Sequence, residues 1–154
     1  EMSEKKIVIC DIDGTIANND HRQHFLEGKK DWDGFFSSLS EDKPIFEIIN
    51  KINNLNFKGH KIAFLTGRPE KYRGETKKWL NRFFSFKYCL IMRKDDDRRN
   101  KLNIKRELFD ENFSKESIHM VFENDEQLIE MWKNLNLSVY EVSSYQSLSS
   151  SDRY

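Results

Sequence analysis

One segment near the start of the chain joins a strand-like run to a pair of acids: Ile7-Val8-Ile9-Cys10-Asp11-Ile12-Asp13-Gly14-Thr15. Its continuously apolar half is typical of a strand buried on both faces of a parallel sheet. The carboxyl end of such a strand is where open α/β sheets bind ligands. Asp11 and Asp13 therefore predict a hard-cation site that holds a phosphate, with Gly14 allowing close backbone approach. A plain strand-ending turn would use the same residue types.

The composition indicates one polar globular domain. Of 154 residues, 37% are apolar and 34% are charged, and the formal net charge is +0. No apolar run is long enough to span a bilayer, and no leader peptide is expected ahead of the first strand. Cys10 and Cys89 lie in apolar runs, which predicts buried, reduced thiols. We therefore expect a cytoplasmic protein without membrane contact, and the balanced charge argues neither for nor against nucleic acid.

Helical patterns alternate with short apolar runs along the rest of the chain. We expect strands at 7–10, 61–65, 88–92, 119–122 and 138–142, and helices at 44–52, 75–84, 102–112 and 126–136. This alternation predicts an α/β fold of three layers, a Rossmann-like domain with a five-stranded parallel sheet. Trp79 and Trp132 are expected in its core. Residues 2–142 would form this domain, and the Ser-rich residues 143–154 an irregular tail.

Residues 16–42 fit neither strand nor helical periodicity well. A stretch of this length without regular structure is uncommon in a compact domain, and it predicts a functional flap over the site. A small surface helix with solvated charges is the alternative. His21 and His24, within the stretch, have no evident metal-binding partners and are interpreted as loop or surface histidines.

Three further groups of polar residues follow later strands or lie in a helix. Thr66-Gly67-Arg68 ends the second strand, and its hydroxyl and guanidinium can bind phosphate. Glu123-Asn124-Asp125 ends the fourth strand, and Lys105 lies in the helical segment between. Lys105 near Asp11 would favour the ionised form of that carboxylate.

In this order, the motifs resemble those of the haloacid dehalogenase-like phosphohydrolase superfamily over residues 6–142. The resemblance implies that Asp11 is the nucleophile that forms an aspartyl-phosphate and that Asp13 is the general acid–base. It implies that Thr66 and Lys105 bind the transferring phosphoryl group. It also implies Mg²⁺ between the Asp11 carboxylate, the Asp13 carbonyl and the last motif. Glu123, Asn124 and Asp125 are the candidate ligands there, and we predict Asn124 as the direct one and Glu123 as a ligand through water.

A closer resemblance is to the 3′-phosphatase domain of phage-type polynucleotide kinase/phosphatases. Arg22 stands at the spacing of a family arginine, and the second motif continues as Gly67-Arg68-Pro69-Glu70. The resemblance implies that Arg22, Gly67, Arg68 and Arg99 contact the substrate. Two departures are present: Lys101 stands where the family usually has an acid, and Glu123-Asn124 replaces the usual Asp-Asp. An amide oxygen is still a hard ligand, so we expect Mg²⁺ binding to be retained in a weaker form.

The expected function depends on how open the site is. Neither position where this superfamily inserts a cap has room beyond residues 16–42, which predicts a minimal cap or none. An open site, together with the basic residues within 93–106, favours a polynucleotide 3′-phosphatase in nucleic-acid end repair. No kinase phosphate loop, Gly-x-x-x-x-Gly-Lys-Ser/Thr, occurs in the sequence, so a stand-alone phosphatase is expected. A nucleotide phosphatase, or a non-catalytic phosphate-binding module, stays open as an alternative.

Overall fold

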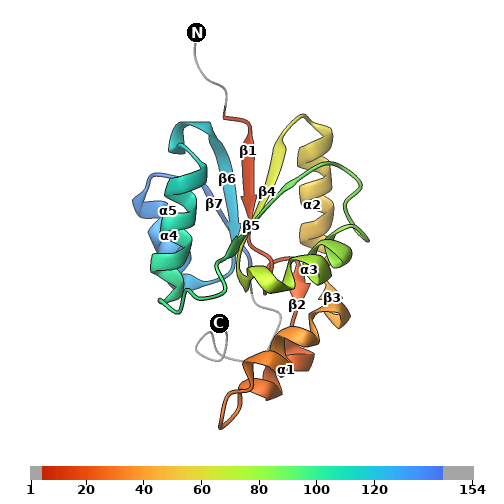
Figure 1. Ribbon diagram of the computed structural model, residues 1–154. Coiled ribbons are helices and arrows are strands. Elements are labelled where there is room, and N and C mark those ends of the chain that lie inside the picture. Colours follow the sequence, from red (N-terminus) through yellow and green to blue (C-terminus); the bar gives the residue numbers. More distant parts are fainter. Residues whose placement is uncertain (1–4, 144–154) are drawn as a thin grey trace.

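A parallel sheet of five strands forms the centre of the molecule (Figure 1). The computed structural model describes residues 5–143, so the predicted Ser-rich tail lies outside the described residues except for Ser143. The strand order is β5-β4-β1-β6-β7, and all neighbours pair in parallel. The strands are β1 Ile7–Cys10, β4 Lys61–Pro69, β5 Cys89–Arg93, β6 Ile118–Glu123 and β7 Val139–Glu141. The expected fold is confirmed, and central β1 delivers Asp11 to the middle of the sheet edge.

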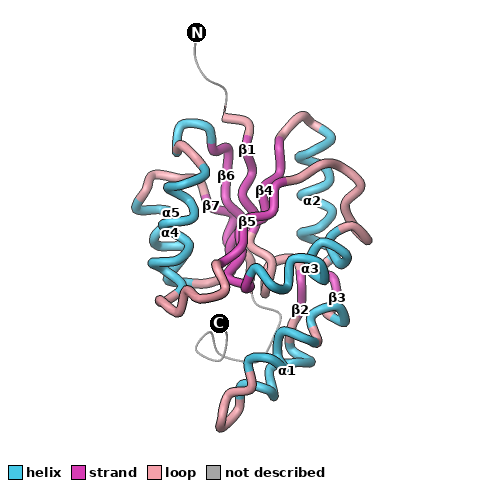
Figure 2. The backbone as a smooth tube through the Cα atoms, viewed as in Figure 1, coloured by secondary structure: helices cyan, strands magenta, loops and turns pink. Residues whose placement is uncertain are grey.

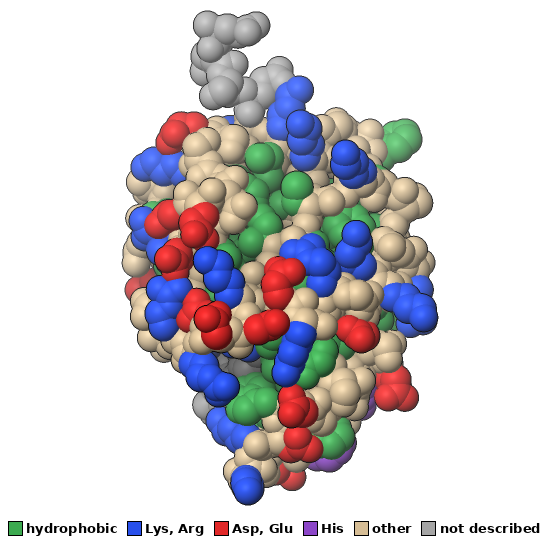
Figure 3. Space-filling model, viewed as in Figure 1, with side chains coloured by type: hydrophobic (Ala, Val, Ile, Leu, Met, Phe, Trp, Pro, Cys, Tyr) green, Lys and Arg blue, Asp and Glu red, His purple; other side chains and the backbone are tan. Residues whose placement is uncertain are grey.

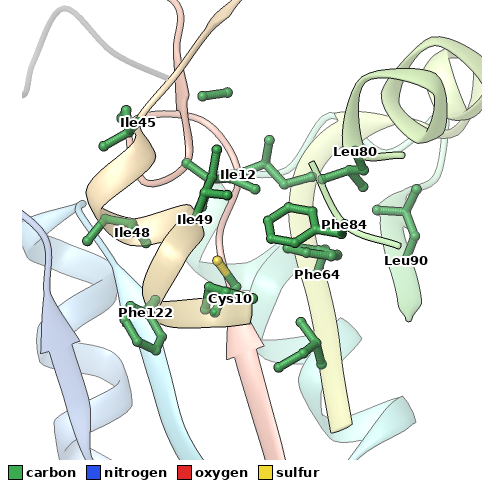
Figure 4. Close-up of a cluster of buried hydrophobic side chains, with 14 of the residues drawn as sticks. Cys10, Ile12, Ile45, Ile48, Ile49, Phe64, Leu80, Phe84, Leu90 and Phe122 are labelled. Carbon is green, nitrogen blue, oxygen red and sulfur yellow. The ribbon is translucent and has the colours of Figure 1, made fainter. Parts of the chain in front are cut away.

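Helices cover both faces of this sheet (Figure 2). They are α2 Phe46–Phe57, α3 Arg73–Leu80, α4 Lys101–Asn112 and α5 Glu126–Asn134. Because successive side chains of a strand point to opposite faces, Val8 and Cys10 pack with α2 and α3, whereas Ile9 packs with α4 and α5. Figure 4 shows the first of these clusters. No helix among residues 5–143 is long and apolar enough to cross a membrane.

Both tryptophans expected in the core are buried, Trp79 on the α3 side and Trp132 on the α5 side. Several helix boundaries differ from the sequence prediction, and tertiary contacts account for two of these differences. Pro44 does not open α2, because it pairs with Ala17 in a two-residue antiparallel ladder. Likewise α3 ends at Leu80, and the chain beyond it turns so that Phe84 packs on Phe64 with ring centroids 5.1 Å apart.

Residues 16–42, which we call the flap, consist of short elements beyond the carboxyl ends of the strands (Figure 1). The flap has a small core of its own, in which Phe35, Phe36 and Leu39 are buried. Its elements are β2 Ala17–Asn18, the 3₁₀ helix Asp20–Leu26, α1 Trp32–Ser37 and the 3₁₀ helix Leu39–Glu41. The strand β3, Lys43–Pro44, follows directly and pairs with β2. The flap is therefore neither a structureless loop nor one surface helix.

The two cysteines lie in different environments. Cys10 is fully buried beneath α2, as expected. Cys89 is exposed, so the prediction of a buried thiol was wrong there. The reason is that Cys89 opens β5, which is an edge strand with a neighbour on one side only.

Trp79 ties α3 to the end of the flap, because its indole Nε1 donates a hydrogen bond to the Asp42 carbonyl oxygen at 2.8 Å. Trp79→Phe removes this buried hydrogen bond, and we expect the free energy of unfolding to fall by about 1–3 kcal/mol. Urea denaturation measures the change. Phe57→Leu is the control, since Phe57 is 89% exposed and its replacement is expected to cost less than about 0.5 kcal/mol. Equal stability of the two variants would contradict this account.

Candidate active site

The carboxyl ends of β1, β4 and β6 and the first turns of α4 surround one cavity of about 1150 Å³. Eight of the predicted site residues line it: Asp11, Asp13, Thr66, Gly67, Arg99, Lys105, Glu123 and Asn124. The structure therefore brings together residues that are up to 113 positions apart in the chain. Figure 3 shows basic and acidic side chains closely mixed over this face of the molecule.

Lys105 is a buried cation between two buried carboxylates. Its Nζ donates to Asp11 Oδ1 at 2.6 Å and lies 3.4 Å from Glu123 Oε1. Asp11 Oδ2 accepts a further hydrogen bond from the Thr15 hydroxyl at 3.1 Å. Further hydrogen bonds fix the Glu123 carboxylate. Its Oε1 also accepts from Trp132 Nε1, and its Oε2 accepts from the backbone amides of Asn124 and Asp125. These contacts fix the Asp11 carboxylate at the cavity floor.

The charges in this cluster do not balance, because one ammonium faces two carboxylates. Burial first, and then the Glu123 charge, raise the pKa of Asp11 to about 8, although Lys105 acts in the opposite direction. Burial disfavours the charged form of Lys105, but the Asp11 and Glu123 carboxylates outweigh it and raise the Lys105 pKa above its usual value. The predicted effect of Lys105 on Asp11 therefore has the correct sign, and the Asp11 pKa rises nonetheless because burial is the larger effect.

Asp13 is held by two arginines. Its Oδ1 accepts from Arg22 Nη2 at 2.7 Å and from Arg68 Nη2 at 2.9 Å, and its Oδ2 accepts from Arg68 Nε at 3.0 Å. Both arginines are fully buried. Neither lines the cavity, so their predicted contact with a substrate phosphate stays a prediction. What the structure shows is that they orient the Asp13 carboxylate.

Asp42 completes this ion network and was missed by the sequence reasoning. Its carboxylate accepts from Arg22 Nε at 2.7 Å and from Arg68 Nη2 at 3.1 Å. His21 Nε2 lies 2.7 Å from the same carboxylate, so His21 belongs to the network and is more than a surface histidine. Nothing in the sequence around Asp42 marks it, because it follows neither a sheet strand nor a recognisable motif.

The end of β4 is irregular, because its pairing register with β5 shifts between Thr66 and Pro69. The Thr66 hydroxyl accepts a hydrogen bond from the Arg68 amide at 3.1 Å, and Thr66 is almost fully buried. The Gly67 carbonyl accepts from Arg93 Nε at 2.8 Å. Arg93 also donates to the Asp97 carbonyl, so it joins this strand end to the loop before α4. Arg93 is a second positioning residue that the sequence reasoning did not assign.

Asn124 lies where a metal ligand was predicted. With its amide nitrogen turned toward them, it donates to Asp11 Oδ2 at 2.9 Å and to the Asp13 carbonyl oxygen at 3.1 Å. Turned over, the amide would present its oxygen at the same point. A carboxylate, a carbonyl and an amide oxygen would then converge, which is a set of ligands that fits a hard cation. Among residues 5–143 no cluster of three His, Cys, Asp or Glu side chains could hold a metal ion, so a site here would rely on this mixed set.

Gly14 makes room for Asn124. A Cβ built on Gly14 would lie 2.1 Å from the Asn124 side chain, and the Gly14 φ angle is +84°. Any larger residue would be strained and would displace Asn124.

Three further charged residues of the site have partners. Asp125 caps α5 through hydrogen bonds from the Gln127 and Leu128 amides, and its other oxygen pairs with Lys101. Glu123 has four donors around its two oxygens. Its water-mediated contact to a metal stays a prediction. Arg99, on the outer rim, pairs with Asp97 and Glu107.

The charge cluster predicts that replacing Lys105 lowers the free energy of unfolding more than replacing Lys101, the other lysine of α4. Lys105→Met leaves Asp11 and Glu123 buried without their cation, so we expect a loss of about 3–5 kcal/mol in the free energy of unfolding. Lys101→Met is the matched control: its pair with Asp125 is partly exposed, and we expect a cost below about 1 kcal/mol. Chemical denaturation in EDTA measures both values. Similar losses in the two variants would show that Lys105 does not hold the cluster together.

Comparison with known proteins identifies the family. Residues 5–146 match the family described as the phosphatase domain of polynucleotide kinase PNKP. A relative from Autographa californica nuclear polyhedrosis virus, whose name pairs polynucleotide kinase with RNA ligase, is 27% identical over 135 residues. That alignment covers 86% of this chain and 18% of the viral protein.

Solved structures agree with this match. A chain in the Pnkp1/Rnl/Hen1 complex superposes with a TM-score of 0.77 at 27% identity, over 95% of this chain and 48% of that chain. The class C acid phosphatase of Bacillus anthracis shares the fold, with a TM-score of 0.64 at 17% identity, over 93% of this chain and 68% of that one. This chain thus spans about half or less of the PNKP-type relatives it matches. It belongs to the family of PNKP phosphatase domains, within the haloacid dehalogenase-like phosphatases, and is a phosphatase.

Proposed function

We propose that this chain is a Mg²⁺-dependent 3′-phosphatase of nucleic-acid ends that works through an aspartyl-phosphate. The observation that carries the proposal is the Asp11 carboxylate, fixed by Lys105 on the floor of a cavity that the flap borders on one side. The volume of that cavity, about 1150 Å³, leaves room for the end of a polymer. The family match supports the substrate class, and the relatives named for nucleic-acid repair complexes or ligases support it further.

The proposed reaction has two displacements at phosphorus. Asp11 Oδ1 attacks the phosphorus atom, the bond to the 3′ oxygen breaks, and a proton from Asp13 goes to that oxygen. Water then attacks the phosphorus of the aspartyl-phosphate and gives a proton back to Asp13, which releases inorganic phosphate and restores Asp11. Lys105 neutralises charge beside the attacking oxygen, and the Thr66 hydroxyl would bind a phosphoryl oxygen.

Asp13 must take up a proton before the first displacement. In the structure its carboxylate is an acceptor for Arg22 and Arg68. A bound phosphate would compete with Asp13 for these guanidiniums, and that competition would make protonation of Asp13 easier. This exchange would reconcile the buried arginines with their predicted role at the substrate.

A magnesium ion would be held by the Asp11 carboxylate, the Asp13 carbonyl and the Asn124 amide oxygen. When bound, it would supply positive charge that lets an anionic carboxylate approach a phosphate. Two supports on this chain favour such a site: three oxygen donors would converge on one point with the Asn124 amide turned over, and the Lys105 cluster carries one carboxylate more than its ammonium can neutralise.

Localisation in the cytoplasm stays a prediction from the sequence.

The metal proposal predicts that two substitutions of Asn124 change the Mg²⁺ requirement in opposite directions. Asn124→Asp adds a negative charge to the donor set and is expected to lower the Mg²⁺ concentration needed for half-maximal phosphate release. Asn124→Ala removes a ligand and is expected to raise that concentration at least about tenfold. Asn100→Asp is the control, because Asn100 also lines the cavity but caps α4, where Asp serves equally well. If both Asn124 variants keep the Mg²⁺ dependence of the unmodified protein, Asn124 is not a ligand.

The substrate proposal is tested by phosphate release from a panel of 3′-phosphorylated oligonucleotides, 3′- and 5′-mononucleotides and a phosphopeptide. We expect oligonucleotides to give the highest kcat/KM, and Asp11→Asn to reduce every substrate to background. Arg98→Ala is expected to weaken oligonucleotides more than mononucleotides and to lower the salt dependence by about one counterion. Arg106→Ala is the control, because Arg106 is exposed on α4 and does not line the cavity.

A mononucleotide hydrolysed more efficiently than any oligonucleotide, with no salt dependence, would overturn the polynucleotide proposal. The enzyme would then be a nucleotide phosphatase, with the same catalytic groups.

A further inference from the structure

Three aromatic side chains form a continuous row on the flap side of the cavity. Trp32 stacks on Phe36 with ring centroids 6.0 Å apart and planes inclined by 23°, and Phe36 stacks on Tyr72 at 5.1 Å and 27°. We call Trp32, Phe36 and Tyr72 the aromatic row. All three line the same cavity as Asp11. The row therefore faces the space in which a substrate would lie.

The row is held rigidly by the packing of α1. Asp31 caps the helix by accepting a hydrogen bond from the Gly34 amide at 2.9 Å. Gly34 itself admits no side chain, because a Cβ there would lie 2.6 Å from the Phe25 ring. Phe35, which is fully buried, anchors the other side of α1 in the flap core. The orientation of Trp32 is thus set by a cap, a close contact and a buried anchor.

Packing alone does not account for the outer end of the row. Phe36 is 3% exposed, as a core residue would be, but Trp32 is 41% exposed. The other two tryptophans of the chain are fully buried. An exposed indole that lines a cavity with a catalytic carboxylate at its floor is a surface for binding a planar group.

Cations stand at both ends of the row. Lys30 Nζ lies 5.7 Å from the Trp32 ring centroid, and Lys71 Nζ lies 5.3 Å from that of Tyr72. Lys71 also pairs loosely with exposed Asp33, at 3.4 Å. Both lysines line the cavity, and their long side chains can move from a ring to a phosphate. A row of aromatic rings with a cation at each end suits a nucleic-acid strand, because bases can stack on the rings while neighbouring phosphates contact the cations.

We propose that the aromatic row is a stacking platform for an unpaired nucleobase at the end of the substrate strand, with Lys30 and Lys71 contacting neighbouring phosphates. The proposal rests on the proposed function and narrows it to strands with an unpaired end. A base inside a duplex is already stacked on both faces, so only a single-stranded or frayed end can offer a face to Trp32. The platform would then place the terminal 3′-phosphate over Asp11.

The experiment compares two 3′-phosphorylated single strands of equal length, one with a normal terminal nucleotide and one whose terminal nucleotide lacks its base. Trp32→Ala is expected to lower kcat/KM for the normal strand about tenfold, which is the usual effect of losing one stacked base. It is expected to leave the abasic strand unchanged, because that strand has nothing to stack. Trp32→Phe should keep most of the activity on the normal strand. Phe57→Ala is the control, since Phe57 is exposed on α2 and does not line the cavity.

A second measurement reports binding without turnover. In the Asp11→Asn variant, the normal strand is expected to quench tryptophan fluorescence and the abasic strand to quench it much less, because Trp32 is the exposed tryptophan. If Trp32→Ala slows both strands equally, or if neither strand quenches the fluorescence, the platform is wrong even though 3′-phosphatase activity stands. If the unmodified protein releases phosphate from neither strand, the proposed function itself fails.

Discussion

The Lys105 ammonium lies between the Asp11 and Glu123 carboxylates, and this buried contact joins three separate parts of the fold. Asp11 follows β1, Glu123 ends β6, and Lys105 projects from the second turn of α4. Separating the groups would leave a charge buried without a partner, which costs several kcal/mol. The contact therefore fixes α4 against the sheet and, at the same time, sets the position of the carboxylate that we propose as the nucleophile. Stability and chemistry depend on the same atoms.

A second buried network joins the flap to this centre. Asp42, at the end of the flap, and Asp13, beside Asp11, share Arg22 and Arg68 as partners. Charged hydrogen bonds thus join the flap to one side of the site. Such a connection can respond to a bound anion, because phosphate and carboxylate compete for the same guanidiniums. It also places the aromatic row at a set distance from the catalytic groups.

The sequence predicted those parts of the molecule that follow from local patterns. The apolar run before Asp11, the alternation of strands and helices and the groups at strand ends were enough for the sheet and for the residues gathered in the cavity. Local patterns could not predict which strands lie at the edge of the sheet or which distant residues pair with one another. Pro44 reads as a helix start until its pairing with Ala17 is known, and Cys89 reads as buried until β5 is known to be an edge strand. Asp42 depends wholly on tertiary contacts. The raised Asp11 pKa depends on the degree of burial, which no sequence pattern measures.

The most direct test of the central claim, that Asp11 is the nucleophile, uses a substrate whose leaving group needs no proton. With p-nitrophenyl phosphate, Asp13→Asn still permits the first displacement but lacks the base for the second. The account predicts a burst of about one p-nitrophenolate per enzyme molecule. Acid-quenched samples should then carry a phosphoryl group on the peptide that contains Asp11. Steady release without a burst, with an unmodified Asp11 peptide, would contradict it.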